Sequence, residues 1–124
     1  MTDLHQMKCV GWPGGEPTLT KDQIAGLMPR VPGWRVDVIE GVKRLERVYK
    51  FPSFANAVAF AKRVADIAEA GDHHPLIMTE WGKVTVQWWT HKIKGLHRND
   101  FTMATKTDRV LSPWAPACAY RSCA

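Results

Sequence analysis

The sequence predicts an α+β fold, with a four-stranded antiparallel sheet and three helices packed on one face, in the chain order α-β-β-α-β-β-α. Two observations lead to this prediction. The strand-like segments occur as two hairpin pairs, and segments with the helical spacing of apolar residues precede, separate and follow those pairs. The length of 124 residues suits a single domain, which we expect over residues 19–111.

The first helix is expected to begin after Thr20, because Gln23 stands at the capping-box position three residues later. Its apolar stripe consists of Ile24, Leu27 and Met28. Pro29 lies where the stripe ends and stops the helix. The glycines and prolines of the preceding segment predict an irregular arm over residues 1–18.

Two hairpins are predicted, each with a two-residue turn. The first covers residues 34–51 and turns at Glu40-Gly41, and the second covers residues 76–91 and turns at Trp81-Gly82. The last arm, Lys83 to His91, alternates between two sets that point in opposite directions. One set is Val84, Val86 and Trp88, and the other is Thr85, Gln87, Trp89 and His91. The face that carries Trp89 is expected to need a ligand or a second subunit to cover it.

The longest helix is predicted to start after the capping residue Ser53 and to be terminated by Gly71. Its expected inner face consists of Phe54, Ala57, Val58, Ala61, Val64, Ala65 and Ala68. A final helix is expected from about Arg98 to Leu111, and a loose tail over residues 112–124.

The composition is that of an ordinary globular protein with a formal net charge of +5. The basic residues are spread along the chain, which favours a solvated mixed surface over a nucleic-acid-binding patch. The three cysteines are Cys9, Cys118 and Cys123, and they have neither zinc-site spacing nor a disulfide framework. No secretory signal and no apolar run long enough to cross a bilayer is seen, so we expect a cytoplasmic protein without a membrane segment.

Four of the five histidines lie between residues 73 and 97. Pro75 favours an extended backbone at His74, so the side chains of His73 and His74 should point to opposite sides. The second hairpin should bring His91 close to both. Imidazoles can give and take protons near neutral pH, and three at one site therefore indicate general acid–base catalysis. The competing interpretation is a set of isolated surface or core histidines.

A metal site is a further alternative, because three histidines can hold zinc with one open position. Adjacent histidines on an extended segment splay apart, however, and the helical spacing of ligands four residues apart is missing. We therefore expect no metal.

Three other side chains have both a structural and a functional interpretation. Asp100 falls at the third position of the final helix, where a carboxylate caps the helix. Glu69 lies in the last turn of the long helix and opposes its dipole, which hints at a role in the following loop, and the structural alternative is a solvated side chain. Trp34 follows Gly33 and could stack on a flat ring or belong to the core.

These residues also carry a resemblance to a known family. Asp72-His73-His74-Pro75, followed by Thr90-His91, Gly95-Leu96 and Asp100, resembles the signature of the pterin-4a-carbinolamine dehydratases. The earlier Gly33-Trp34 fits the same family. The resemblance covers most of the chain, from about Leu19 to Val110.

The resemblance implies a four-stranded antiparallel sheet backed by three helices, a homodimer or homotetramer, and no cofactor. It also implies an activity: 4a-hydroxytetrahydrobiopterin loses water to give quinonoid dihydropterin, so that an aromatic amino-acid hydroxylase can reuse its pterin. By position, His73 and His91 would form the acid–base pair, and His74 would hold the pterin. The remaining implied pocket and supporting residues are Pro75, Thr90, Lys92, Ile93, Asp72, Asp100, Trp34 and Glu69.

Some relatives suggest an alternative, in which the chain is a non-catalytic binding module that stabilises a dimer or assists the assembly of another protein. Two departures from the family pattern also matter. Lys94 stands where many relatives have a glycine, which should alter the loop near His91. His97 replaces the usual Ser or Thr cap, which should weaken the start of the final helix.

Overall fold

The computed structural model of the protein describes residues 18–111. In chain order its elements are α1 (Lys21–Leu27), the 3-10 turn η2 (Met28–Arg30), β1 (Arg35–Ile39), β2 (Val42–Lys50), α2 (Phe54–Gly71), β3 (Leu76–Glu80), β4 (Lys83–Trp88), the 3-10 turn η3 (His91–Ile93) and α3 (Arg98–Val110). This order confirms the predicted fold class. The predictions for the arm before Thr18, the tail and the three cysteines lie outside the described residues.

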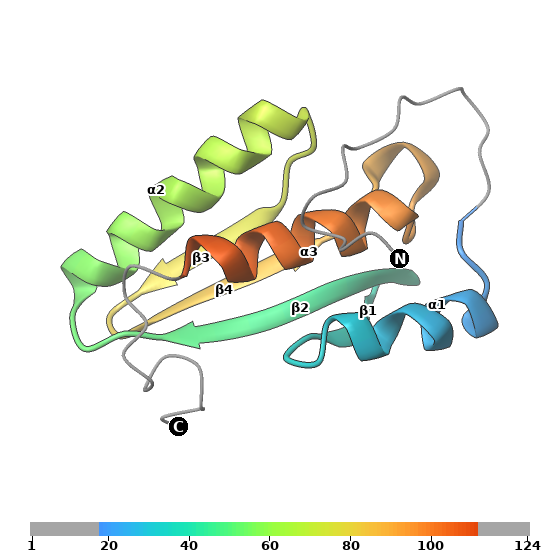
Figure 1. Ribbon diagram of the computed structural model, residues 1–124, viewed down its shortest axis with the longest axis horizontal. Helices are drawn as coiled ribbons and strands as arrows, with labels where there is room; N and C mark the ends of the chain where they lie inside the picture. The colour runs from blue at the N-terminus through green and yellow to red at the C-terminus, as the bar shows by residue number, and fades with distance from the viewer. Residues whose placement is uncertain (1–17, 112–124) are drawn as a thin grey trace.

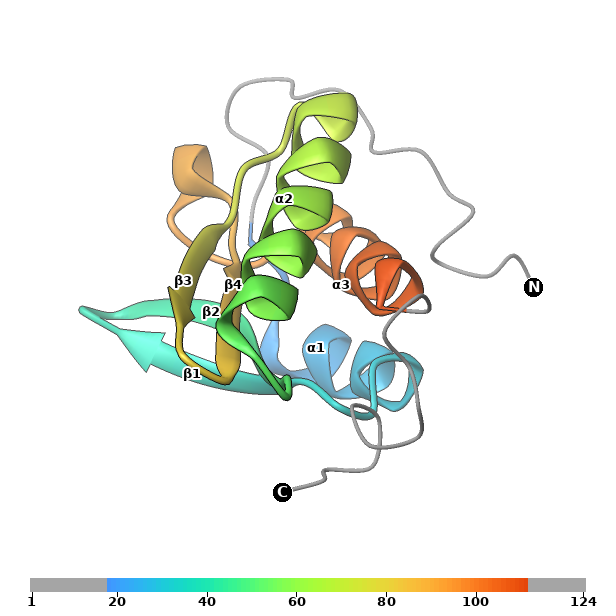
Figure 2. The ribbon, with the colours of Figure 1, turned by 90° about the vertical axis from the view of Figure 1, so that its left-hand side faces the viewer.

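The four strands form one antiparallel sheet in the order β1-β2-β4-β3. Each predicted hairpin is present, and the pairing of β2 with β4 joins the two hairpins into a single sheet. The helices lie on one face of this sheet, as Figures 1 and 2 show. The other face is therefore without helices in the described part of the chain.

The core lies between the sheet and the helices α2 and α3. Strand β4 contributes Val84, Val86 and Trp88, all fully buried, as its alternation predicted. Helix α2 buries Ala57, Phe60, Val64 and Ala68. The predicted inner face of α2 was wrong at two positions, because Phe54 is 49% exposed and Val58 is 44% exposed. Phe60 takes the central place instead and packs against Tyr49 and Phe51.

Local capping signals set most of the helix ends. Thr20 and Gln23 form the predicted capping box of α1, and Ser53 caps α2 through the backbone N–H of Asn56. The end of α2 differs from the prediction. Gly71 stays in the helix, and Asp72 adopts the left-handed conformation with φ of 49° that terminates it.

The carboxylate of Asp108 ties α3 to the first hairpin. It accepts hydrogen bonds from the Trp34 indole at 3.0 Å, from the Arg47 guanidinium at 2.9 Å and from the Tyr49 hydroxyl. Burial raises the pKa of the Asp108 carboxyl, and the contacts with Arg47, Tyr49 and Trp34 oppose that rise without cancelling it. Asp108 is thus the polar junction between the sheet and α3.

Replacing Asp108 with alanine should lower the free energy of unfolding by roughly 2–4 kcal/mol, because three donors lose their acceptor. The raised pKa means that the folded state holds the Asp108 proton to a higher pH than the unfolded chain does. The stability that Asp108 contributes therefore declines as the pH rises through the folded pKa. Urea unfolding of both proteins should show a larger difference near pH 4 than near pH 7, and a difference that grows with pH would contradict this.

The helix-free face of the sheet is covered only in part. Val48 and Met78 lie on it and are 42% and 47% exposed, so the expectation that a ligand or a second subunit covers this face stays a prediction. Thr85 and Gln87 point to this face and are nevertheless buried. Gln87 accepts from Arg44 at 3.0 Å and donates to Glu46 at 2.6 Å, and Glu46 also binds Arg35. Burial pushes the pKa of Glu46 upward, but the donors Gln87 and Arg35 outweigh it and lower this pKa. The network joins the Glu46 carboxylate directly to the Arg35 guanidinium and, through Gln87, to that of Arg44.

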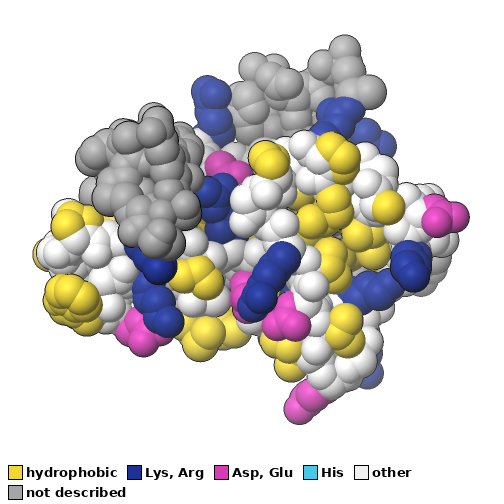
Figure 3. Space-filling view, turned by 90° about the horizontal axis from the view of Figure 1, so that it is seen from below, with side chains coloured by type: hydrophobic (Ala, Val, Ile, Leu, Met, Phe, Trp, Pro, Cys, Tyr) yellow, Lys and Arg dark blue, Asp and Glu magenta, His cyan; other side chains and the backbone are white. Residues whose placement is uncertain are grey.

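The surface shows no single basic patch on the face seen in Figure 3. Lys and Arg side chains lie there in several separate places, with Asp and Glu side chains next to some of them. This face has the mixed character that the spread of charges in the sequence predicted. Within residues 18–111, no helix is both long enough and apolar enough to cross a membrane.

Candidate active site

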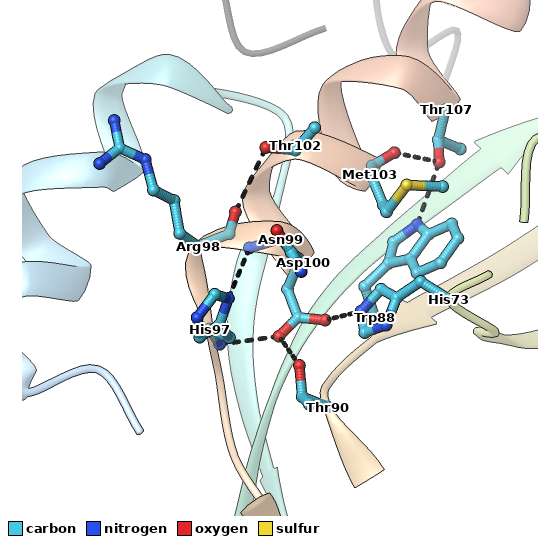
Figure 4. A network of polar contacts seen from close by, with 10 residues as sticks. All are labelled: His73, Trp88, Thr90, His97, Arg98, Asn99, Asp100, Thr102, Met103 and Thr107. Carbon is cyan, nitrogen blue, oxygen red and sulfur yellow. Dashed lines mark hydrogen bonds and ion pairs between the residues drawn. The ribbon is translucent and has the colours of Figure 1, made fainter. Parts of the chain in front are cut away.

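Asp100 is the centre of the candidate site. Its carboxylate is fully buried in the first turn of α3 and binds three groups (Figure 4). One oxygen contacts Nε2 of His73 at 2.6 Å, and the other accepts from the Thr90 hydroxyl at 2.9 Å and from the His97 backbone N–H at 2.8 Å. The predicted capping role is confirmed. The same carboxylate also binds His73, which precedes β3, and Thr90, which follows β4.

His73 is fixed in two ways. Because a carboxylate oxygen accepts, the contact with Asp100 places a hydrogen on Nε2. The imidazole also stacks on the Trp88 ring, with centroids 5.6 Å apart and planes 13° apart. Trp88 is itself anchored, since its indole N–H donates to Thr107 at 3.0 Å. His73 is 6% exposed, so both its tautomer and its orientation are set by the fold.

His74 lies in a different environment from its neighbour. It is exposed, and its Nε2 contacts Glu69 at 3.1 Å. The change from a buried His73 to an exposed His74 fits the extended backbone that Pro75 predicted. Glu69 thus contacts the loop after α2, but its side chain is 78% exposed, so the solvated interpretation holds as well. Asp72 is exposed and Pro75 is half-buried in the same loop.

The segment that carries His91 corrects the predicted length of the last strand. Strand β4 ends at Trp88, and His91 begins the 3-10 turn η3. A bridge between Thr90 and Gly95 closes this turn into a small loop. His91 is exposed and lies against the Trp89 ring, with centroids 4.4 Å apart. In the same loop Lys92 is exposed and Ile93 is half-buried.

The structure joins three of the predicted residues directly, namely His73, Thr90 and Asp100. His73 and Thr90, the neighbour of His91, bind the same carboxylate, so the two histidine-bearing segments meet at Asp100. Trp34 instead binds Asp108, eight residues later on α3, which is about 12 Å along the helix axis. Trp34 is buried in the core there, which agrees with its structural interpretation.

Sequence reasoning missed two contributors to this region. Trp88 was assigned to the core, and its stacking on His73 was not expected. Arg44 was not singled out, although its guanidinium carbon lies 3.8 Å from the centre of the Trp89 ring. The alternation of β2 places Arg44 on the same face as Glu46, but only the register between β2 and β4 shows that this face meets Trp89.

In the part of the chain that the structure describes, no three His, Cys, Asp or Glu side chains are grouped so that they could hold a metal ion. The carboxylate oxygens of Asp100 are bonded to His73, to Thr90 and to the backbone N–H of His97 at the start of α3. The buried carboxylate of the candidate site thus orients an imidazole.

Comparison with known proteins gives the family. A family model described as pterin 4 alpha carbinolamine dehydratase matches residues 17–110. The chain belongs to this family. A solved structure from Brucella melitensis, titled transcriptional coactivator/pterin dehydratase, is similar to it with a TM-score of 0.67 and 29% identity. That match covers 75% of this chain and 97% of the other.

The two departures from the dehydratase family pattern now have structural descriptions. His97 does not leave α3 uncapped, because its Nδ1 accepts from the Asn99 backbone N–H at 3.1 Å and Asp100 completes the capping box. The predicted weakening rested on the missing Ser or Thr hydroxyl, and a ring nitrogen supplies the acceptor instead. Lys94 adopts the left-handed conformation with φ of 52°, which explains why a glycine suits this position.

Proposed function

We propose that this protein dehydrates a 4a-hydroxytetrahydropterin, such as 4a-hydroxytetrahydrobiopterin, to quinonoid dihydropterin and water. Membership of the dehydratase family supports the reaction class. The observation that carries the proposal is the buried Asp100 carboxylate, which binds His73 and the residue next to His91. A carboxylate that orients a histidine is a common way to prepare an imidazole for proton transfer.

The reaction needs two proton transfers. The bond between C4a and the hydroxyl oxygen breaks, and that oxygen must take a proton to leave as water. A proton is lost from the neighbouring ring nitrogen, whose electron pair forms the new carbon–nitrogen double bond. Atoms balance without any oxidant or cofactor, and an acid and a base suffice. We assign this pair to His73 and His91, and we assign His74 with Glu69 to binding the pterin.

Other residues of the loops are proposed as pocket walls. Pro75 and Asp72 border the two adjacent histidines, and Lys92 and Ile93 follow His91 on η3. We assign Trp34 a supporting role, since it is buried and its indole binds Asp108 on α3, the helix that also carries Asp100.

Stopped-flow absorbance with freshly generated carbinolamine tests the proposal. We expect the protein to accelerate loss of water clearly above the spontaneous rate, because positioned acid–base groups contribute roughly a hundredfold to ten-thousandfold. Heat-denatured protein at the same concentration serves as the control. A rate equal to the spontaneous one would reject the proposed activity.

A second candidate function is binding to another protein, alone or beside catalysis. The Brucella melitensis structure carries the word coactivator in its title. Two apolar side chains on α2, Phe54 and Val58, lie one helical turn apart and are nearly half exposed. A double variant that lacks the His73 and His91 imidazoles but keeps its quaternary state and partner binding would favour this function.

The remaining expectations are part of the same proposal. They are a homodimer or homotetramer, a functional link to an aromatic amino-acid hydroxylase, a cytoplasmic location, and work without a metal or organic cofactor. Light scattering of the purified protein and metal analysis of the same sample test the first and the last of these.

A further inference from the structure

The position of His91 depends on an aromatic neighbour. His91 is exposed and stands at the start of η3, a 3-10 turn of three residues. Within residues 18–111, the ring in contact with its imidazole is Trp89, at 4.4 Å between centroids and 37° between planes. A group that must meet a substrate atom at one angle needs such support, since an exposed side chain samples several rotamers.

Trp89 is in turn covered by Arg44. The guanidinium carbon of Arg44 lies over the Trp89 ring, 3.8 Å from its centre, which is within the range of a cation–π contact. Arg44 belongs to β2 and Trp89 follows β4, so the contact depends on the pairing of Leu45 with Trp88 between these strands. The contact therefore links the first hairpin to the segment that carries His91.

The guanidinium of Arg44 is held by one hydrogen bond, and its Nε–H is buried without a partner among the described residues, which does not help the fold. One terminal nitrogen donates to Gln87 at 3.0 Å. Nε of Arg44 is buried and has no hydrogen-bond partner in the described part of the chain. A buried donor without a partner is a cost to folding, and each such case calls for a reason. The cation–π contact with Trp89 supplies one, because it fixes the guanidinium over the ring.

We propose that Arg44 is a positioning residue for the dehydration, which holds the Trp89 ring in the one orientation that directs the His91 imidazole toward the substrate. This inference rests on the proposed function. Arg44 acts through Trp89 and touches neither His91 nor the reacting atoms in this account. Its loss should therefore lower kcat and leave KM nearly unchanged.

Three variants test the inference in the full-length protein. Arg44→Met keeps an unbranched side chain and removes the planar cation, and Arg44→Lys keeps the charge without the plane. Lys50→Met is the matched control, because it removes one positive charge from the same strand and the same face, and Lys50 is exposed near the other end of β2. Circular dichroism and thermal unfolding verify that each variant is folded.

The kinetic expectation is a split between kcat and KM. Arg44→Met should lower kcat roughly tenfold with KM within about twofold of the wild type, as expected when a catalytic group loses its orientation. Arg44→Lys should recover part of this loss, and Lys50→Met should match the wild type. An unchanged kcat in Arg44→Met overturns the inference. A rise in KM alone also overturns it, because Arg44 would then be a substrate contact.

A second readout does not need the activity. The carbon-bound ring protons of His91, assigned by comparison with a His91→Gln sample, feel the ring current of Trp89. In Arg44→Met their NMR signals should move toward those of an exposed histidine, and in Lys50→Met they should stay. If the wild type gives only the spontaneous rate, the proposed function fails, and the NMR signals alone decide whether Arg44 positions His91. Signals that do not move overturn the positioning role whatever the kinetics show.

Discussion

Replacing either His73 or His91 with glutamine is expected to lower kcat by about two to four orders of magnitude. Glutamine keeps much of the side-chain volume and can donate a hydrogen bond to Asp100 in place of His73, but it cannot exchange a proton near neutral pH. Because one imidazole would serve as the acid and the other as the base, the double variant should be little slower than the slower single variant.

Stopped-flow kinetics with the four proteins measure this effect. His74→Gln is the internal control, since His74 is exposed and is assigned to binding, and it should change KM more than kcat. Urea unfolding separates a chemical role from a structural one. A His91→Gln variant with wild-type turnover would remove His91 from the mechanism, and a His73→Gln variant that no longer folds would make that histidine structural.

Asp100→Asn should reduce kcat by about a hundredfold or more while leaving the fold intact. If the amide NH2 of the introduced asparagine faces Nε2 of His73, two donors meet. The ring must then adopt its other tautomer, or the contact breaks. The charge that steadies a protonated imidazole would also be lost. The amide oxygen can still accept from His97 N–H, so the cap of α3 should survive with a loss of about 1 kcal/mol.

The matched comparison is Asp22→Asn, which replaces an exposed acid in the first turn of α1. This variant should retain full activity and nearly full stability. Kinetics and urea unfolding on the same preparations give both quantities for each variant. If Asp100→Asn loses stability but keeps its kcat, Asp100 is a helix cap and nothing more.

The sequence predicted best those features that depend on residues close together in the chain. The capping box at Thr20, the cap at Ser53 and the Trp81-Gly82 turn all involve residues within four positions of each other. Such signals need no knowledge of the rest of the chain. The antiparallel sheet followed from them, because two hairpins in one small domain leave few other arrangements.

The errors arose where packing overrides a local pattern. Phe54 and Val58 fit an apolar stripe, yet the way α2 lies on the sheet buries Phe60 and Val64 and leaves both of them exposed. The alternation after Lys83 seemed to continue to His91, but the chain leaves the strand at Trp88 and closes a loop through Thr90 and Gly95.

The candidate site divides in the same way. The convergence of His73, His74 and His91, predicted from the hairpin and from Pro75, stays a prediction; what the structure shows is that His73 and Thr90, the neighbour of His91, bind the same carboxylate. The contact between Asp100 and His73 joins residues 27 positions apart, and no spacing rule predicts it. The stacking of Arg44 on Trp89 depends on which strands become neighbours in the sheet, and that is decided by the assembled core.

Two of the left-handed residues constrain how this sequence can diverge. Asp72 directly precedes His73, and Lys94 closes the turn that begins at His91, with φ of 49° and 52°. Residues with a branched Cβ are disfavoured there by roughly 1–2 kcal/mol, whereas glycine and asparagine are accepted. Random mutation at these two sites should therefore yield a narrow set of surviving residues, even though neither side chain is buried. The backbone geometry next to His73 and His91 would then decide which residue types these two positions accept, and contact with a ligand would not.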